Sequence, residues 1–232
     1  MRKSAAGWMA VSLLAPFAAT APAMTAAETG SVGIFQGQSD VGSVSPSGTA
    51  AYDSRIDAYT LTSAGANTWY HVDGFHYLWK KVTGDWTLSA DVAFPPPAYR
   101  HEPNPHRKGI LMFRQTLDPG AAYAALDVHG SGMTALQYRR ERGANTEDIE
   151  LNIALPKSVR IEKRGDTFTV FLSGAGEPLQ QVGASTRLHL KSPFYLGLGA
   201  VSHDVETTDT VRFAHVTLRR PAAATHTRPV LY

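Results

Sequence analysis

Several strand-like segments of this 232-residue chain carry isolated polar or charged side chains within otherwise apolar sequence. An imidazole can exchange protons near neutral pH, while guanidinium and amide groups can hydrogen-bond to sugar hydroxyls or carboxylates. A curved sheet that gathers these side chains into one groove would create a ligand site. The side chains are His76, Arg114, Asp127, His129, Gln137, Arg139 and His203.

Aromatic residues lie close to these polar groups in the sequence. A flat ring can stack on the apolar face of a pyranose, or it can fill a protein core. Trp86 begins a regular alternation with Leu88, so we expect it in the core. We expect Trp79 and Asp73 to join the ligand site. Arg114 requires a carboxylate or an anionic ligand if its guanidinium is buried, and Asp73 and Asp127 are both candidate partners; we favour such structural pairing over ligand contact.

The elements that must position these groups are strands. Apolar and polar residues alternate with a period of two, for example from Trp86 to Phe94, and Gly, Asp and Pro residues separate the alternating segments. Helical spacing of apolar residues is hard to find after residue 28. We therefore predict an all-β chain, a two-sheet antiparallel β-sandwich or jelly roll.

Two predicted strands, 75–82 and 109–115, are apolar on both faces. Such strands lie centrally in a sheet, and a further part of the protein must cover their second face. We assign His76 to the groove because Arg114, in the second of these strands, also lies on a face of mixed polarity. Trp79 lies on the face opposite to His76, so it would reach the groove only from the end of its strand.

The rest of the chain divides into a leader, one domain and a tail. Residues 1–27 have a basic start, an apolar run and small residues at the end, which is typical of a secretory signal peptide. Residues 28–218 form the predicted sandwich, and 219–232 read as a disordered tail. Within the sandwich, segment 95–107 has five prolines in thirteen residues and predicts a stiff loop that forms one wall of the groove.

Composition limits the possible partners and the compartment. Without residues 1–27 the chain keeps 20 Lys and Arg against 20 Asp and Glu, because the leader holds two of the 22 basic residues and no acidic one. This balance argues against nucleic acid as the main partner. Cysteine is absent, so packing must stabilise the fold. We expect an exported protein, periplasmic or extracellular, without a transmembrane segment.

The order of several motifs resembles that of an uncharacterised family, often labelled regulation-of-enolase-like, in the concanavalin A-like lectin/glucanase superfamily. The resemblance spans about residues 32–218 and includes the segments WYHVDGFHYLWKKVTGD, HRKGILMFRQTLDPGAAYAALDVHGSG, TALQYRRERG, VRIEKRGDTFTVFLSG and PFYLGLGAVSHD. It implies a concanavalin A-like jelly roll in an exported protein. The recurring polar and aromatic positions of that family fall on Trp69, Asp73, Phe75, His76, Trp79, Arg114, Gln137, Tyr138, Ser202 and His203.

Catalytic motifs of related sandwich enzymes are not found in this sequence. Retaining glucanases of that superfamily carry a Glu-x-Asp-x-x-Glu strand motif, which is absent here; the nearest segment, Glu147 to Glu150, reads as a solvated edge strand. A jelly-roll polysaccharide lyase needs a Tyr or His base and a group that neutralises a uronate carboxylate. His129, Tyr138 and Arg114 supply these residue types without a motif. We therefore assign no catalytic residue and expect a binding protein rather than an enzyme.

Metal ligation has little support in the sequence. His101, Glu102 and His106 lie in the proline-rich loop without the spacing of a zinc site. A calcium site among loop aspartates is the only cofactor that remains open, and no metal ligand is assigned.

These observations predict a secreted sandwich that binds a glycan, or another small polar ligand, in a groove on a concave sheet. Two alternatives stay open: a polysaccharide lyase or glycoside hydrolase that uses the same groove, and a structural or interaction module of the cell envelope. The oligomeric state is not predicted. The expected ligand-binding residues are His76, Trp79, Arg114, Gln137, His203 and Asp73.

Overall fold

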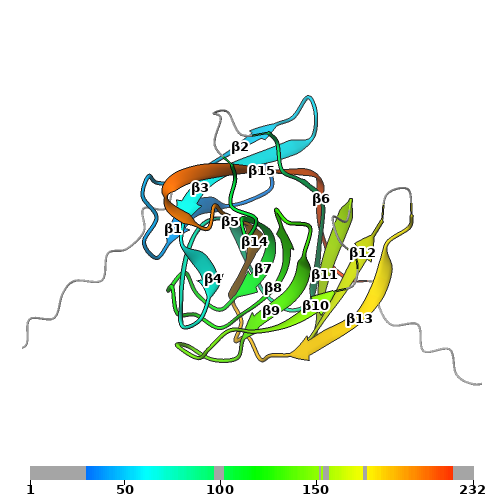
Figure 1. Ribbon diagram of the computed structural model, residues 1–232. Helices are drawn as coiled ribbons and strands as arrows, with labels where there is room; N and C mark the ends of the chain where they lie inside the picture. The colour runs from blue at the N-terminus through cyan, green and yellow to red at the C-terminus, as the bar shows by residue number, and fades with distance from the viewer. Residues whose placement is uncertain (1–29, 97–101, 152, 154–156, 175–176, 222–232) are drawn as a thin grey trace, which may run out of the picture.

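The computed structural model describes residues 30–96, 102–151, 153, 157–174 and 177–221. These residues form 15 β-strands in two antiparallel sheets, and no helix occurs among them, so none of the described residues belongs to a helix that could cross a membrane. The predicted two-sheet antiparallel sandwich is confirmed (Figure 1). The expected leader, 1–27, lies outside the described residues.

One layer is an eight-stranded sheet. Its neighbouring strands are, in order, β1 (Gly37–Val41), β5 (Val72–Val82), β14 (Phe194–Val201), β7 (Lys108–Arg114), β8 (Tyr123–His129), β9 (Thr134–Arg139) and β10 (Glu147–Leu151). The eighth strand, β4 (Asn67–Trp69), pairs only with the beginning of β5. The 75–82 and 109–115 segments are therefore central strands, as their apolar character on both faces predicted.

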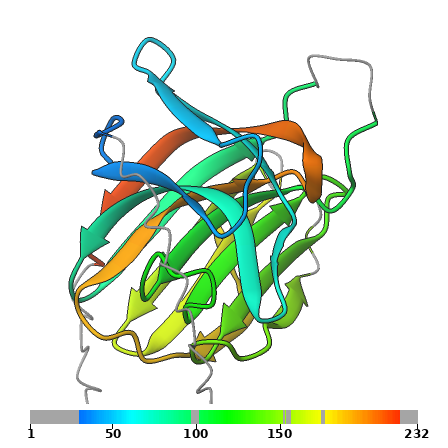
Figure 2. The same ribbon diagram turned by 90° about the vertical axis from the view of Figure 1, so that its left-hand side faces the viewer.

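The other layer is a seven-stranded sheet. Its strands are, in order, β13 (Gln180–Arg187), β12 (Thr167–Ser173), β11 (Ser158–Arg164), β6 (Trp86–Ala93), β15 (Asp204–Arg219), β3 (Ala58–Gly65) and β2 (Thr49–Asp53). Figure 2 shows the two layers after a quarter turn. β15 continues to Arg219, one residue into the expected tail, and residues 222–232 lie outside the described part of the chain.

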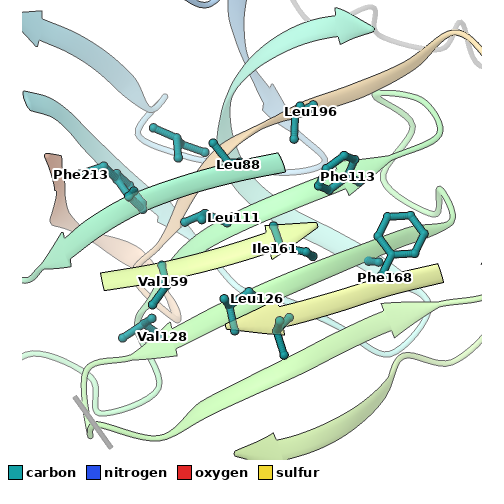
Figure 3. Close-up of a cluster of buried hydrophobic side chains, with 14 of the residues drawn as sticks. Leu88, Leu111, Phe113, Leu126, Val128, Val159, Ile161, Phe168, Leu196 and Phe213 are labelled. Atoms are coloured by element: carbon teal, nitrogen blue, oxygen red, sulfur yellow. The ribbon is translucent and has the colours of Figure 1, made fainter. Parts of the chain in front are cut away.

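The main hydrophobic core fills the space between the sheets (Figure 3). Side chains from both layers meet there, including Leu111, Phe113, Leu126, Val128 and Leu196 from the eight-stranded sheet and Leu88, Val159, Ile161, Phe168 and Phe213 from the seven-stranded sheet. Trp86 packs against this core, as its alternation predicted. One face of each strand supplies these residues because successive side chains of a strand point to opposite faces.

A second apolar cluster lies on the outer face of the eight-stranded sheet. Every residue of β7, β8 and β9 is buried, so both faces of these strands are covered. The cluster comprises Val41, Phe75, Tyr77, Trp79, Ile110, Met112, Tyr123, Ala125 and Val201. The outer face of these strands is therefore buried as well. The sequence predicted that another part of the protein covers this face, and other residues of the same chain provide that cover.

Residues 67–74, here called the cover hairpin, provide much of that cover. β4 and the first residues of β5 form this hairpin, and in Figure 1 it lies beside β7 and β8. The Tyr123 hydroxyl donates to the carbonyl oxygen of Thr68 at 3.2 Å, so the hairpin lies directly over β8. The amide of Asp73 donates to the carbonyl oxygen of Pro119 at 2.9 Å, which joins the hairpin to the loop after β7.

Candidate functional site

A closed group of three charges lies beneath the cover hairpin. Asp73, from the hairpin, accepts hydrogen bonds from Arg114 Nη1 at 3.0 Å, from Arg139 Nη1 at 2.9 Å and from Arg139 Nη2 at 2.7 Å. The side chains of all three residues are fully buried. Backbone carbonyl oxygens accept most of the remaining guanidinium protons; Arg114, for example, also donates to Thr116 and Asp118.

The carboxylate of Asp73 neutralises the charge of Arg114. The structural pairing of Arg114 with Asp73 is confirmed, and the arginine is engaged by protein groups on several sides. A buried guanidinium held by a carboxylate and carbonyl oxygens is satisfied without a ligand. Arg114 and Asp73 therefore hold the cover hairpin on the sheet, and in this conformation neither faces an open groove.

The assignment of His76 to the same face as Arg114 is wrong. His76 pairs with Ala200, which belongs to the core between the sheets, whereas the cluster on the outer face takes Phe75, Tyr77 and Trp79 from the same strand. His76 is 2% exposed, and its Nδ1 lies 2.8 Å from Asp40 Oδ1. The face of Arg114 carries Phe75, Tyr77 and Trp79 because strand parity is set by the pairing with β14, which the sequence did not reveal.

Two other predicted binding residues lie on the outer face but are enclosed. Trp79 is 6% exposed; its indole Nε1 donates to Ser39 Oγ at 3.0 Å, and its ring packs edge-on against Tyr195. Gln137 is 2% exposed, and its Oε1 accepts a hydrogen bond from Lys108 Nζ at 2.9 Å. No side of either residue is open enough for a sugar ring to stack on it in this conformation.

Lys108 and Asp127 form a buried ion pair at the opposite end of β7 from Arg114. Lys108 Nζ lies 3.3 Å from Asp127 Oδ2, and it also donates to Thr68 Oγ1 at 3.2 Å. The ion pair lacks the alignment of a hydrogen bond, so among the described residues neither oxygen of the Asp127 carboxylate has a hydrogen-bond partner. Burial raises the pKa of Asp127 to about 6, although Lys108 opposes this shift.

Three histidines gather beside this ion pair, and we call them the histidine cluster. The ring of His106 lies 6.0 Å from that of His129 and 5.4 Å from that of His203, measured between centroids. His129 ends β8, His203 stands in the turn between β14 and β15, and His106 belongs to the loop before β7. The fold therefore places His203 in the same cluster as His129, whereas His76 lies on the opposite face of the sheet.

The histidine cluster contains polar atoms that nothing in the described chain satisfies. His129 is 3% exposed, yet neither Nδ1 nor Nε2 has a hydrogen-bond partner among the described residues, and the same holds for Nδ1 of His203. Nearly all buried polar atoms in folded proteins have a partner, so such exceptions require a cause. The backbone of His203 adopts a φ of 61°, a left-handed conformation that is uncommon outside glycine, Asn, Asp and His.

Burial and neighbouring groups keep the imidazoles of His129 and His203 neutral. Burial, followed by the charge of Lys108 and the two neighbouring histidines, lowers the pKa of His129 to about 3. Burial and the neighbouring His106 and Lys108 also lower the pKa of His203. A neutral imidazole has one donor and one acceptor nitrogen, which suits a hydroxyl group.

The described part of the proline-rich segment 95–107 lies beside the histidine cluster, because Asn104 Nδ2 donates to the carbonyl oxygen of His203 at 3.2 Å. Its role as a groove wall stays a prediction, and two members of the candidate site were missed from the sequence. Residues 97–101, including His101, lie outside the described chain. Lys108 and His106 were not assigned to the site, although each stands close to the apolar 109–113 run that predicts a central strand.

The residue set of the lyase alternative does not converge. Tyr138 packs in the core between the sheets, whereas Arg114 lies in the charged group under the cover hairpin and His129 lies in the histidine cluster. Glu147, Asp148 and Glu150 are exposed on β10, which is the edge strand that their sequence predicted. Among the residues that the structure describes, no group of three or more potential ligands is placed to hold a metal ion.

Comparison with known proteins supports the fold. No family model matches the chain, so membership of the regulation-of-enolase-like family stays a prediction. No curated protein matches it either. A functionally unknown protein from Saccharomyces cerevisiae superimposes with a TM-score of 0.55 at 12% identity, over 75% of this chain and 93% of that one.

Two further solved structures are more distant. A family 7 alginate lyase has a TM-score of 0.46 at 11% identity, over 76% of this chain and 83% of that one. The Lotus tetragonolobus seed lectin has a TM-score of 0.38 at 10% identity, over 87% of this chain and 96% of that one. Likeness at these identities concerns the fold alone. The chain is a two-sheet antiparallel β-sandwich.

Proposed function

We propose that this protein binds a neutral, hydroxyl-rich ligand, most simply a glycan, at the histidine cluster. The observation that carries the proposal is the buried imidazole of His129, which lacks a hydrogen-bond partner on either nitrogen among the described residues. A ligand hydroxyl can donate to one imidazole nitrogen and accept from another. Binding would thus satisfy polar atoms that have no hydrogen-bond partner among the described residues.

The charge of the site favours a neutral ligand over an acidic one. Lys108 and Asp127 offset each other, and the lowered pKa values of His129 and His203 keep both rings uncharged at neutral pH. An anionic sugar would lose hydration without gaining a free cation in return. Sugar hydroxyls, by contrast, match the alternating donors and acceptors of neutral imidazoles.

The same geometry argues against the lyase alternative. A lyase must neutralise the carboxylate of its substrate, and Arg114 is already committed to Asp73 and to backbone carbonyl oxygens. A base with a pKa of about 3, such as His129, is also a weak proton acceptor at neutral pH.

Export, expected from residues 1–27, would bring a binding protein to extracytoplasmic glycans.

A glycan array followed by calorimetric titration of any bound glycan tests the proposal. Two variants probe the site: His129→Leu, and His203→Asn, in which Asn tolerates the positive φ of that position. Each should weaken binding about tenfold or more, because one or two hydrogen bonds to the ligand are lost. His189→Asn is the matched control, since His189 is exposed on the loop after β13.

Each result has a definite meaning. Binding by the native protein that both variants weaken, without formation of a cleavage product, supports the proposal. Cleavage of a bound glycan would instead make the protein an enzyme. If no glycan binds, or if both variants bind as well as the native protein does, ordered water alone serves these nitrogens and the proposal fails.

A further inference from the structure

A hollow of about 660 Å³ lies on the outer face of the seven-stranded sheet, and we call it the arginine groove. Ligand sites commonly have volumes of roughly 300–1,000 Å³, so the groove has room for a small ligand or a short oligomer. Three central strands, β11, β6 and β15, supply most of its lining. Their core-facing residues alternate with the lining residues, as strand geometry requires.

The strand register arranges the lining in cross-strand rows. In one row Thr217, Ser89 and Arg160 lie side by side, and in the next Arg219, Thr87 and Glu162 do. The first row holds two hydroxyl groups beside one arginine, and the second holds one hydroxyl group between two charged groups, at the spacing of about 5 Å between paired strands. Such a floor can hydrogen-bond to hydroxyls and carboxylates along the same ligand.

Positive charge predominates in the arginine groove. Four arginines line it, Arg160, Arg164, Arg219 and Arg220, against the two carboxylates Asp91 and Glu162, which leaves a formal charge of +2 with His215 neutral. The carboxylates are already engaged. His215 Nδ1 lies 2.9 Å from Asp91 Oδ2, Ser158 donates to Asp91 Oδ1, and Glu162 accepts from Thr87 at 3.1 Å and from Arg164.

Arg160 and Arg219 are the cations available to a ligand. Neither forms an ion pair with any of the residues that the structure describes, and Arg219 is exposed. Arg160 is positioned from two sides, because its Nε donates to Ser89 Oγ at 3.1 Å and its guanidinium lies 5.5 Å from the centroid of the Phe171 ring. A guanidinium held in this way keeps further N–H donors free for a carboxylate.

The position of the groove distinguishes between acidic ligands. An extended acidic peptide gains affinity by pairing with a free sheet edge, but β11, β6 and β15 are all internal strands with partners on both sides. The lining is also mostly hydroxyl and charged groups, with Leu179, Ala90 and Pro221 as its apolar members. These features suit a uronate sugar, which carries a carboxylate and several hydroxyls on each unit.

We propose that the arginine groove binds an acidic oligosaccharide through the carboxylates of its uronate units, at Arg160 and Arg219. This second site does not depend on the proposed glycan binding at the histidine cluster. It differs from that site in ligand charge, because hydroxyl recognition there needs neutral imidazoles and carboxylate recognition here needs free arginines.

Calorimetric titration of the full-length protein with oligogalacturonate of six units tests this proposal. Arg160→Gln and Arg219→Gln should each raise the Kd about tenfold or more, since each removes a charge-assisted hydrogen bond. The native affinity should also fall when the salt concentration is raised from about 50 to about 500 mM. Added salt shortens the Debye length and so screens the attraction between exposed charges. Arg212→Gln is the matched control, because Arg212 is exposed on β15 but does not line the groove.

Two comparison ligands complete the experiment. A neutral hexasaccharide should bind the native protein at least about tenfold more weakly than oligogalacturonate at this site. Poly-L-glutamate that binds as tightly as oligogalacturonate would overturn the assignment to a sugar. The proposal also fails if the native protein does not bind oligogalacturonate, or if the double variant of Arg160 and Arg219 binds it with native affinity. His203→Asn should leave this binding unchanged, which separates this result from the test of the histidine cluster.

Discussion

Arg114, on β7, donates from Nη1 to Oδ2 of Asp73, in the cover hairpin, across 3.0 Å. The two residues lie 41 positions apart in the sequence, and their side chains are fully buried. Arg139 donates to the same carboxylate, so two cations share one acidic group. The ion pair and the neighbouring carbonyl oxygens attach the hairpin to the sheet.

Asp73→Asn should therefore destabilise the fold strongly. The variant keeps the shape of the side chain but leaves Arg114 and Arg139 buried without a counter-charge, which typically costs about 3–5 kcal/mol. Urea unfolding at pH 7 measures the free energy of unfolding. Asp53→Asn is the control, because Asp53 pairs with Arg55 on the surface and its loss should change little. Equal effects of the two substitutions would contradict a structural role for the buried carboxylate.

His129→Leu should change how stability depends on pH. The pKa of His129 is about 3 in the folded protein and about 6.5 when unfolded, so between these values the unfolded chain binds more protons and native stability falls as pH falls. The leucine variant lacks this loss. At pH 4.5 it should gain about 3 kcal/mol relative to the native protein, compared with the difference at pH 7.

Unfolding curves at several pH values measure this difference for native and variant protein. His189→Leu is the matched control, because the side chain of His189 is 68% exposed. If His129→Leu and native protein lose stability in parallel between pH 7 and 4.5, the histidine is not held neutral by its surroundings.

The buried Lys108 and Asp127 should show strong energetic coupling. Lys108→Met alone leaves the Asp127 carboxylate buried without its cation, at a cost of about 3–5 kcal/mol. The double variant Lys108→Met and Asp127→Leu should recover much of that loss because no charge remains unpaired. A double-mutant cycle from urea unfolding measures the coupling. The same cycle on Arg55 and Asp53 should give a value near zero, and an equally small value for the buried pair would show that the pair is not coupled.

Gly197→Ala tests the close approach of β14 to β5. A Cβ atom at Gly197 would lie 2.0 Å from the carbonyl oxygen of Leu78, a backbone atom that cannot move aside easily. We expect a loss of about 1–3 kcal/mol or more in the free energy of unfolding, because the two strands must separate. Gly30→Ala should have little effect, since no atom lies within 4 Å of its Cβ position. A native-like midpoint for Gly197→Ala would show that the sheet adjusts.

The fold follows from the sequence because strand periodicity is a local property. Alternation placed Trp86 against the core, and apolar residues on both faces of 109–115 correctly indicated a central, covered strand. Local periodicity does not determine which face of strand 75–82 lies on the same side of the sheet as Arg114. That depends on the register between β5 and β14, which lie far apart in the chain, and a shift of one residue reverses every side chain.

The candidate site was only partly predictable for a related reason. Polar side chains within apolar strands were correctly singled out, but sequence does not tell whether two such groups satisfy each other. Arg114 forms an ion pair with Asp73, which lies in a hairpin that folds back over the sheet. His129 and His203 lie in the same cluster but form no hydrogen bond to each other. His106 joined them from a loop whose path no periodic pattern specifies.

The cover hairpin turns part of a two-layer sandwich into three layers, with β7, β8 and β9 as the middle one. Backbone amides in a middle layer reach solvent only when an outer layer lifts away, so their exchange with deuterated water reports on global opening. Edge strands such as β10 and β13 have no such protection. We therefore expect the most slowly exchanging backbone amides directly beneath a hairpin that buried ion pairs attach to the sheet.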